Sequence, residues 1–134
     1  MESIPVELRQ FVAARAGERC EYCLLPQIAT LHKHELDHII PRQHGGATDV
    51  DNLALACFRC NRYKGPNLGS LDPDSGELVG FFHPRRHRWE DHFELVESII
   101  HPLTAEARVT IIILKLNDPE RVAERRALID AGLY

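Results

Sequence analysis

Hydrophobic and polar residues follow two different periods along the first half of the chain, and each change of period marks a structural element. Apolar side chains recur every three or four positions over residues 5–16, which predicts an amphipathic helix. Alternation and β-branched residues then predict a strand over 34–40, and a second strand follows over 52–56 after a loop that contains glycine. A short helix is expected at 61–64. The pattern is that of a β-loop-β-α unit.

The second half of the chain is expected to contain a hairpin and two helices. Asp72-Pro73-Asp74-Ser75-Gly76 is strong turn chemistry, and residues 77–82 can form a strand beside it. Thr104 can cap a helix whose apolar face has the spacing i, i+3, i+4 and i+7, formed by Val109, Ile112, Ile113 and Leu116. Asp118-Pro119 then begins a last helix to about Asp130.

Length and composition fit a single domain over residues 1–134. The chain is 44% apolar and 27% charged, as in globular proteins that bury a modest core. The run Ile111–Leu114 is too short to span a bilayer, and the first residues lack the basic and apolar blocks of a signal peptide, so a cytoplasmic location is expected. The net charge of -4 argues against general polyanion binding. Residues 57–88 nevertheless contain six arginine or lysine side chains and three carboxylates, which leaves a local basic segment.

Four cysteines occur as two Cys-x-x-Cys pairs, and their spacing is that of zinc ligands. Thiols stay reduced in the cytosol, so the pairs indicate a metal site rather than disulfides. Four thiolates close a tetrahedral Zn²⁺ site, which would hold segments distant in sequence in a fixed geometry. We therefore expect one structural Zn²⁺ bound by the four cysteines, which are Cys20, Cys23, Cys57 and Cys60.

The residues between and just after the two cysteine pairs carry a resemblance to a known family. In order, the chain has Cys-x-x-Cys, Asp-His-Ile-Ile-Pro at 37–41, Gly-Gly, Asn-Leu-x-Leu from Asn52, and Cys-x-x-Cys-Asn followed by a lysine. This order resembles the HNH endonucleases, also called ββα-metal or His-Me finger nucleases, over residues 19–65. The resemblance implies an α+β fold: a small ββα-metal core stabilised by the zinc site, with an N-terminal helix and a C-terminal extension over 66–134 that contains the hairpin and helices.

The resemblance also implies roles for three residues. His38 would be the general base, and Asn52 would be the middle residue of the motif, holding the loop that bears His38 through side-chain to backbone hydrogen bonds. Asn61 stands where the family name expects histidine, so this chain is an H-N-N variant. The implied activity is DNA cleavage by water attack that leaves a 5′-phosphate and a 3′-hydroxyl.

The same residues suit this chemistry when they are considered without the family name. Phosphodiester hydrolysis needs an activated water and a cation on the phosphate oxygens, where charge develops in the transition state. Neighbouring residues on a strand point to opposite faces, so Asp37 can bind a metal while His38 faces the water. Asp37 and Asn61 offer oxygen ligands, which favour Mg²⁺ or Mn²⁺ as the catalytic ion.

Basic residues near the motif are candidates for contacts with DNA phosphates. Arg62 and Lys64 lie on the helix that carries Asn61, and Arg85 and Arg86 belong to the basic segment. Trp89 and Phe93, spaced by four, are interpreted as core anchors rather than base-stacking groups. A homodimer or a partner protein could supply target recognition.

Two other functions remain as alternatives. The first is a zinc-stabilised nucleic-acid-binding module that has lost catalysis; the intact trio His38, Asp37 and Asn61 argues against it. The second is a zinc-thiolate redox switch, which would require exposed and reactive cysteines. The interpretation that we adopt is the nuclease.

Overall fold

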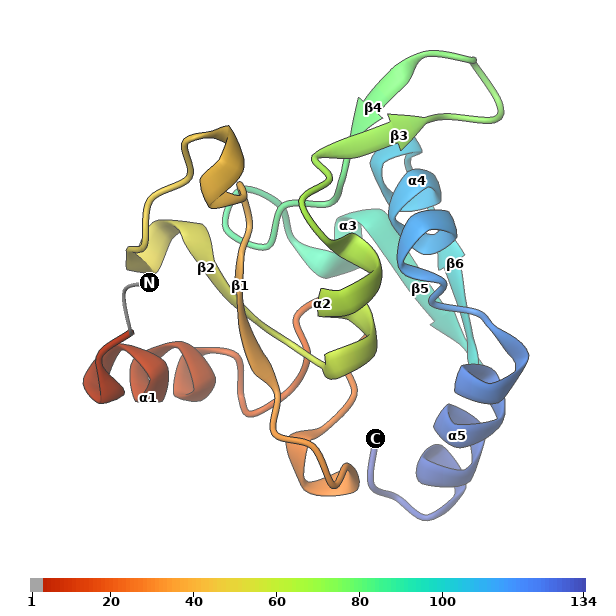
Figure 1. Cartoon of the computed structure of the whole chain (residues 1–134). Coiled ribbons are helices and arrows are strands. Elements are labelled where there is room, and N and C mark those ends of the chain that lie inside the picture. The colour runs from red at the N-terminus through yellow and green to blue at the C-terminus, as the bar shows by residue number, and fades with distance from the viewer. Residues whose placement is uncertain (1–3) are drawn as a thin grey trace.

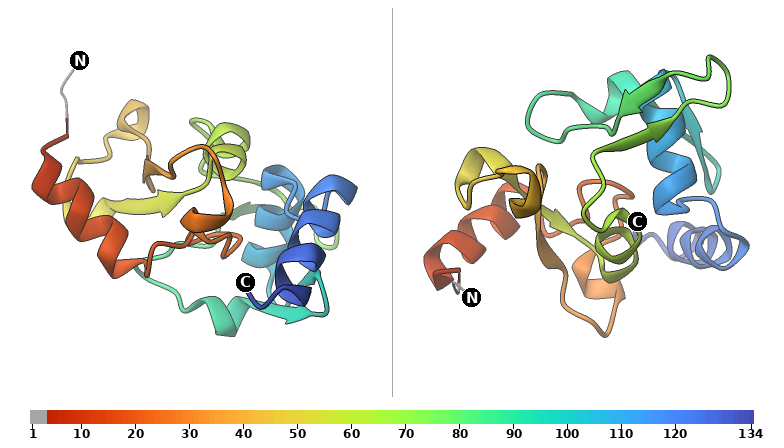
Figure 2. Two further views of the ribbon diagram at one scale, coloured as in Figure 1. Left: turned by 90° about the horizontal axis from the view of Figure 1, so that it is seen from below. Right: turned by 45° about the horizontal axis from the view of Figure 1, so that its top comes forward.

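The computed structural model describes residues 4–134, and its first half contains the predicted β-loop-β-α unit (Figure 1). The elements of this half are α1 (Val6–Arg15), β1 (Glu35–His38), β2 (Leu53–Ala56) and α2 (Phe58–Lys64). Single 3-10 turns occur at Gln27–Ala29, Arg42–His44 and Val50–Asn52. β1 and β2 pair antiparallel, with Asp37 opposite Ala54, and α1 and α2 lie on either side of this pair (Figure 2). The unit places the end of β1 beside α2.

The second half adds two further hairpins and three helices. Its elements are β3 (Gly69–Leu71), β4 (Leu78–Gly80), α3 (Trp89–His92), β5 (Phe93–Val96), β6 (Ile99–Pro102), α4 (Ala105–Leu114) and α5 (Pro119–Asp130). Within residues 4–134 the strands form three separate two-stranded antiparallel sheets. The fold is therefore α+β, as expected. Among the described residues, no helix is long and apolar enough to cross a membrane.

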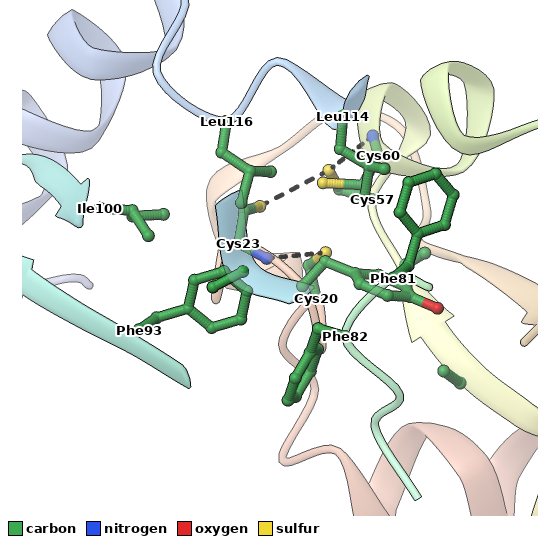
Figure 3. Close-up of a cluster of buried hydrophobic side chains, with 14 of the residues drawn as sticks. Cys20, Cys23, Cys57, Cys60, Phe81, Phe82, Phe93, Ile100, Leu114 and Leu116 are labelled. Atoms are coloured by element: carbon green, nitrogen blue, oxygen red, sulfur yellow. Dashed lines mark hydrogen bonds between the residues drawn. The ribbon is translucent and has the colours of Figure 1, made fainter. Parts of the chain in front are cut away.

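The larger hydrophobic core is shared between the motif and the C-terminal extension. Buried side chains of the extension surround the four cysteines (Figure 3); they include Phe81, Phe82, Phe93, Ile100, Leu114 and Leu116. A smaller cluster of Val12, Leu53 and Leu55 fixes α1 to β2. Phe93 is buried and Trp89 is partly buried against the same core, so the prediction that both are core anchors is confirmed.

The predicted apolar face of α4 is only partly correct. Ile112 is 51% exposed, whereas the buried residues of the helix are Ala107, Val109, Thr110 and Leu114. The Thr110 hydroxyl explains the difference, because it accepts a hydrogen bond from the Phe82 amide (2.9 Å) and donates to Glu106 O (2.7 Å). This polar anchor turns the helix so that part of its isoleucine-rich stretch faces outward.

The hairpin of β5 and β6 was not expected from the sequence. Its two-residue turn is Glu97-Ser98, and Glu97 adopts a positive φ of 57°. Asparagine and glycine are the residues that usually signal such turns, because they tolerate positive φ at low cost. A glutamate at this position gives no such signal.

Candidate functional site

The four cysteines lie together in the core. Cys20 and Cys23 follow α1, Cys57 caps α2, and Cys60 lies in its first turn. All four are buried, and their sulfur atoms lie within 4.8 Å of one another. The Sγ atoms of Cys23 and Cys57 are 3.7 Å apart (Figure 3). Four sulfurs arranged tetrahedrally about Zn²⁺ at about 2.3 Å would be roughly 3.8 Å apart, so the cluster fits such an ion.

Backbone amides complete this cluster. The amide of Cys23 donates to Cys20 Sγ (3.5 Å), and the amide of Cys60 donates to Cys57 Sγ (3.4 Å). Donors of this kind stabilise thiolates, the form in which cysteine binds metals. Because all four cysteines are at most 3% exposed, the redox-switch alternative, which required exposed thiols, is not supported.

His38 lies at the C-terminal end of β1 with its ring held in place. Its Nε2 is 2.7 Å from the hydroxyl of Thr48, and the residue is half-buried. Burial lowers the pKa of His38 below its ordinary value, and the charge of Arg42 lowers that pKa further. The imidazole is therefore neutral at pH 7 and able to accept a proton.

Asn52 ties together the two ends of the loop between β1 and β2. Its Oδ1 accepts from the Ile40 amide (2.9 Å), and its Nδ2 donates to Ile40 O (2.9 Å) and Ala47 O (2.8 Å). These are side-chain to backbone bonds of the kind expected for this residue. Asn52 is 8% exposed, so it supports the loop rather than reaching into solvent.

Asp37 is buried in a network that the sequence did not reveal. The Tyr22 hydroxyl donates to Asp37 Oδ2 (2.6 Å), and Lys64 Nζ donates to Asp37 Oδ1 (3.1 Å). Burial raises the pKa of Asp37, and the charge of Lys64 opposes that rise. Both carboxylate oxygens of Asp37 therefore already have donors.

Lys64 is placed differently from the prediction that it contacts DNA phosphates. It is 1% exposed, and its ammonium also donates to His38 O (3.1 Å) and Ile39 O (3.0 Å). A buried ammonium with three oxygen partners cannot reach a phosphate on the surface. We correct the prediction accordingly: Lys64 positions Asp37 and the end of β1.

Asn61 projects from α2 toward the start of β1. Its Nδ2 donates to Glu35 Oε1 (2.8 Å). Glu35 and Asp37 lie two residues apart on β1, so both side chains point to the same face of the strand, and this face is the one that meets α2. The structure thus brings Asp37 to Lys64 and Tyr22, Asn61 to Glu35, and His38 to Thr48.

Of the two residues expected to bind the catalytic divalent ion, Asn61 is suited to do so and Asp37 is not while it is paired with Lys64. The bond from Nδ2 to Glu35 orients the Asn61 amide, whose oxygen is a suitable ligand for Mg²⁺ or Mn²⁺. Asp37 does not fit while Lys64 holds Oδ1, because a metal ion would lie beside a positive ammonium in a buried site. Binding of a divalent ion at Asp37 therefore competes with the ion pair between Asp37 and Lys64.

The three predicted DNA-contacting arginines occupy different environments. Arg62 is exposed, with its guanidinium over the Phe58 ring (5.6 Å to the centroid), and Arg86 is also exposed. Arg85 is mostly buried and forms an ion pair with Glu21; burial lowers the pKa of Arg85 to about 10. Arg85 is therefore already engaged within the protein.

A groove of about 500 Å³ separates the loop after β1 from the basic segment. Its walls comprise Asn52 and the loop residues on one side and the basic segment on the other; they include His44, Gly45, Gly46, His83, Arg85 and Arg86. The groove is thus continuous with the loop that Asn52 holds. Asp49 and Asp51 also line it, so its charge is mixed.

Several residues of the site were missed by the sequence analysis. Glu35 could have been found by strand alternation, since it precedes Asp37 by two positions, and Tyr22 lies inside the first Cys-x-x-Cys pair. Thr48 follows the glycine pair by two residues but belongs to no motif that we used. Arg121, which contacts the cysteines from α5, is far away in sequence and gave no signal.

Comparison with known proteins identifies the central part of the chain. A family model described as HNH endonuclease matches residues 20–67. The CRISPR-associated endonuclease Cas9 of Corynebacterium diphtheriae is 44% identical over 52 residues, which cover 38% of this chain and 5% of that protein. No solved structure matches the chain. Residues 20–67, which contain the β-loop-β-α unit and the cysteine cluster, therefore match the HNH endonuclease family.

Proposed function

We propose that this chain is a metal-dependent endonuclease that hydrolyses DNA phosphodiester bonds, with His38 as the general base. The observation that carries the proposal is the placement of His38. Its half-exposed ring lies at the end of β1, bonded to Thr48, and Asn52 clamps the loop that follows. Fixed positioning of a neutral imidazole is what general-base catalysis requires.

The proposed mechanism assigns Nδ1 of His38 as the proton acceptor, which requires the tautomer in which Nε2 donates its hydrogen to Thr48 Oγ1. If Nε2 carries the hydrogen and donates it to Thr48 Oγ1, then Nδ1 is the unprotonated nitrogen. Nδ1 would take a proton from the water that attacks phosphorus. Thr48 and Asn52 act only through His38, and both are therefore positioning residues.

The divalent ion remains part of the proposal, as Mg²⁺ or Mn²⁺. When bound, such an ion supplies positive charge to the phosphate oxygens on which negative charge develops. Asn61 is proposed as a ligand, supported by the orientation that its bond to Glu35 imposes. Asp37 is proposed as the second ligand, available when its bond to Lys64 is given up. The zinc proposed for the cysteine cluster is structural and takes no part in the reaction.

Contacts with DNA are proposed for the exposed cations along the groove. Arg86 on the groove wall and Arg62 on α2 are exposed and are suited to bind backbone phosphates. Arg85 lines the same groove but is paired with Glu21, so we propose a smaller contribution from it. The net charge of -4 implies that binding is local and sensitive to salt.

We further propose that residues 1–134 act as one domain. The side chains that surround the cysteines come from both the matched segment and the extension, so neither part has this core by itself. Recognition of a particular target could come from a second copy of the chain or from a partner protein.

Plasmid cleavage tests the proposed function. Purified protein is incubated with supercoiled plasmid, linear duplex and single-stranded DNA in Mg²⁺ or Mn²⁺, and the cut ends are mapped. We expect divalent-ion-dependent nicking or linearisation that leaves 5′-phosphate ends. Binding of DNA without cleavage under any of these conditions would favour the alternative, a catalytically inactive zinc-stabilised nucleic-acid-binding module.

A further inference from the structure

A buried arginine of α5 lies against the cysteine cluster. Arg121 is 5% exposed, and its Nη2 donates to Cys60 Sγ (3.0 Å) and lies 3.8 Å from Cys57 Sγ. Its Nη1 donates to Leu114 O (2.7 Å) at the end of α4. One guanidinium therefore bridges the sulfur cluster and the α4–α5 junction. Arg121 lies well outside the segment that matches the family model.

The charge of Arg121 is balanced by sulfur rather than by a carboxylate. Among residues 4–134, none of the ion pairs with aspartate or glutamate involves Arg121. A buried guanidinium without a negative partner is strongly unfavourable. Four thiolates around Zn²⁺ carry a net charge of about -2, because four single negative charges exceed the two positive charges of the ion. The loaded cluster thus supplies the counter-charge that Arg121 lacks elsewhere.

A second arginine reinforces the arrangement one helical turn later. Arg125 is 3% exposed and donates to Ser98 O (2.8 Å), Leu116 O (2.8 Å) and the Tyr134 hydroxyl (3.2 Å). The Tyr134 hydroxyl in turn donates to Cys23 O. Arg121 and Arg125 line one small cavity together with Cys23 and Cys57. Arg121 therefore contacts the sulfurs directly, and Arg125 fastens the same face of α5 to the core beside them.

We infer that α5 is part of the metal centre, with Arg121 as the counter-ion of the zinc–thiolate cluster. Zinc binding and the docking of α5 are then coupled, and the coupling acts in both directions. Zinc supplies the negative cluster that holds Arg121 in the core, and Arg121 stabilises the loaded cluster and lowers its tendency to release the ion. This inference concerns the cysteine site and does not depend on the proposed nuclease activity.

Zinc affinity tests this inference, with Arg126 as a matched control. Arg126 follows Arg125 on α5 and is exposed. Zinc dissociation constants are measured by competition with a chromogenic chelator for the wild type, Arg121→Met and Arg126→Met, after circular dichroism has shown that each variant is folded. Replacing a side chain that contacts a metal ligand typically lowers the affinity for the metal by about 10–100-fold. We expect a loss of that size for Arg121→Met and no change for Arg126→Met.

A milder variant keeps the test decisive if Arg121→Met does not fold. Arg121→Lys retains the positive charge but loses the planar pair of nitrogens that reaches both the sulfurs and Leu114 O. If Arg121→Met folds, we expect the zinc affinity of Arg121→Lys to lie between those of the wild type and Arg121→Met. If Arg121→Met does not fold, we expect the zinc affinity of Arg121→Lys to be lower than that of Arg126→Met. Equal zinc affinities for Arg121→Lys, Arg126→Met and the wild type would overturn the inference.

Discussion

Asp37 and His38 are adjacent in sequence but lie in different environments. Asp37 is buried, between the Tyr22 hydroxyl and the Lys64 ammonium, whereas the His38 ring is half-exposed and bonded to Thr48. Strand geometry causes the separation, because neighbouring side chains on β1 point to opposite faces. One dipeptide thus supplies a buried carboxylate to the β1–α2 interface and a neutral imidazole to the loop.

The candidate site residues could be chosen from the sequence, but their partners could not. Spacing alone indicated the cysteine cluster, and the structure gathers all four sulfurs. The burial of Lys64 was not predictable in the same way. Its helical position suggested exposure, but the carbonyls of His38 and Ile39 lie within reach and hold its ammonium. Such a contact depends on how α2 packs on β1, which local sequence does not specify.

Replacing Lys64 tests whether Asp37 binds the divalent ion. Lys64→Met removes a positive charge next to Asp37, so we expect Mn²⁺ to bind at least several-fold more tightly at pH 8. The same change leaves a buried carboxylate unpaired and should lower the free energy of unfolding by about 3–5 kcal/mol. Calorimetric titration is therefore performed well below the melting temperature, with Arg62→Met on the same helix as the control. An Mn²⁺ affinity unchanged by Lys64→Met would mean that the ion does not bind at Asp37.

The role of Arg86 in DNA binding can be separated from that of Arg85. Arg86 is exposed on the groove wall, whereas Arg85 is paired with Glu21. Each phosphate contact contributes about -0.9 to the slope of log K against log salt on duplex DNA. We expect Arg86→Ala to flatten that slope by about one unit without changing the melting temperature. If the slope in fluorescence anisotropy titrations stays the same, the DNA lies on another face.

The loop between β1 and β2 is built around a close approach of two backbone segments. A Cβ atom added to Gly46 would lie 1.6 Å from Ile40 O and 2.8 Å from Asn52 Nδ2. No side chain can occupy that space. Glycine at position 46 therefore permits Asn52 to form hydrogen bonds with both ends of the loop. The lack of space for a side chain explains why the second residue of the Gly-Gly pair is glycine.

Alanine at Gly46 should displace the loop and, with it, the support of His38. We expect Gly46→Ala to reduce cleavage by at least tenfold while zinc content stays unchanged, because the four cysteines all lie outside residues 39–52. Gly45→Asn is the control: Gly45 has φ +88° and open space around it, and asparagine tolerates positive φ. Plasmid cleavage rates compare the two variants. Equal rates for Gly46→Ala and Gly45→Asn would contradict this account of the loop.

The elements of the motif followed from the sequence more closely than those of the extension. β1, β2 and α2 lie where the pattern placed them, with ends shifted by a few residues. The outward rotation of Ile112 and the Glu97-Ser98 turn arise from tertiary contacts and from a backbone conformation that these residue types do not signal. The sequence pattern therefore predicted secondary structure most accurately within the motif.

The cysteine cluster joins the two halves of the chain. Trp89, in the extension, donates its indole hydrogen to Tyr22 O (2.9 Å), between the first two cysteines. Phe81, Phe82 and Phe93 pack around the same cluster. This shared core could not be derived from the sequence, because nothing in residues 66–134 marks which side chains meet the cysteines.

Removal of zinc should therefore unfold more than the motif. Binding energies of structural zinc sites are about 10–16 kcal/mol, at least as large as the stability of most domains. We expect chelation of zinc, or Cys57→Ser, to shift the emission of Trp89 to longer wavelength, because its indole loses the contact with Tyr22. Trp89 is the sole tryptophan, so the signal is unambiguous. Protein purified without chelators that contains no zinc, or emission unaffected by chelation, would contradict this prediction.

The pH dependence of cleavage should reflect the lowered pKa of His38. A general base works in its neutral form, and burial lowers the pKa of His38 below about 6.5, the ordinary imidazole value. The rate should therefore be maintained at pH 7 and fall only as the pH decreases below that ordinary value. Rates measured between pH 5 and 8 at saturating metal ion check this prediction. A rate that already declines between pH 8 and pH 7 would indicate a different group.

The cleavage rate of His38→Ala tests directly whether His38 is the general base. General-base catalysis contributes about 10²–10⁴-fold, so the rate should fall by that factor while zinc content, divalent-ion binding and DNA affinity are retained. Added imidazole should partly restore cleavage in His38→Ala and do nothing for Asp37→Ala, because Asp37 is proposed as a ligand of the divalent ion and not as the base. If His38→Ala instead cuts DNA at the wild-type rate and with the wild-type pH profile, His38 is not the base and the proposed mechanism is wrong.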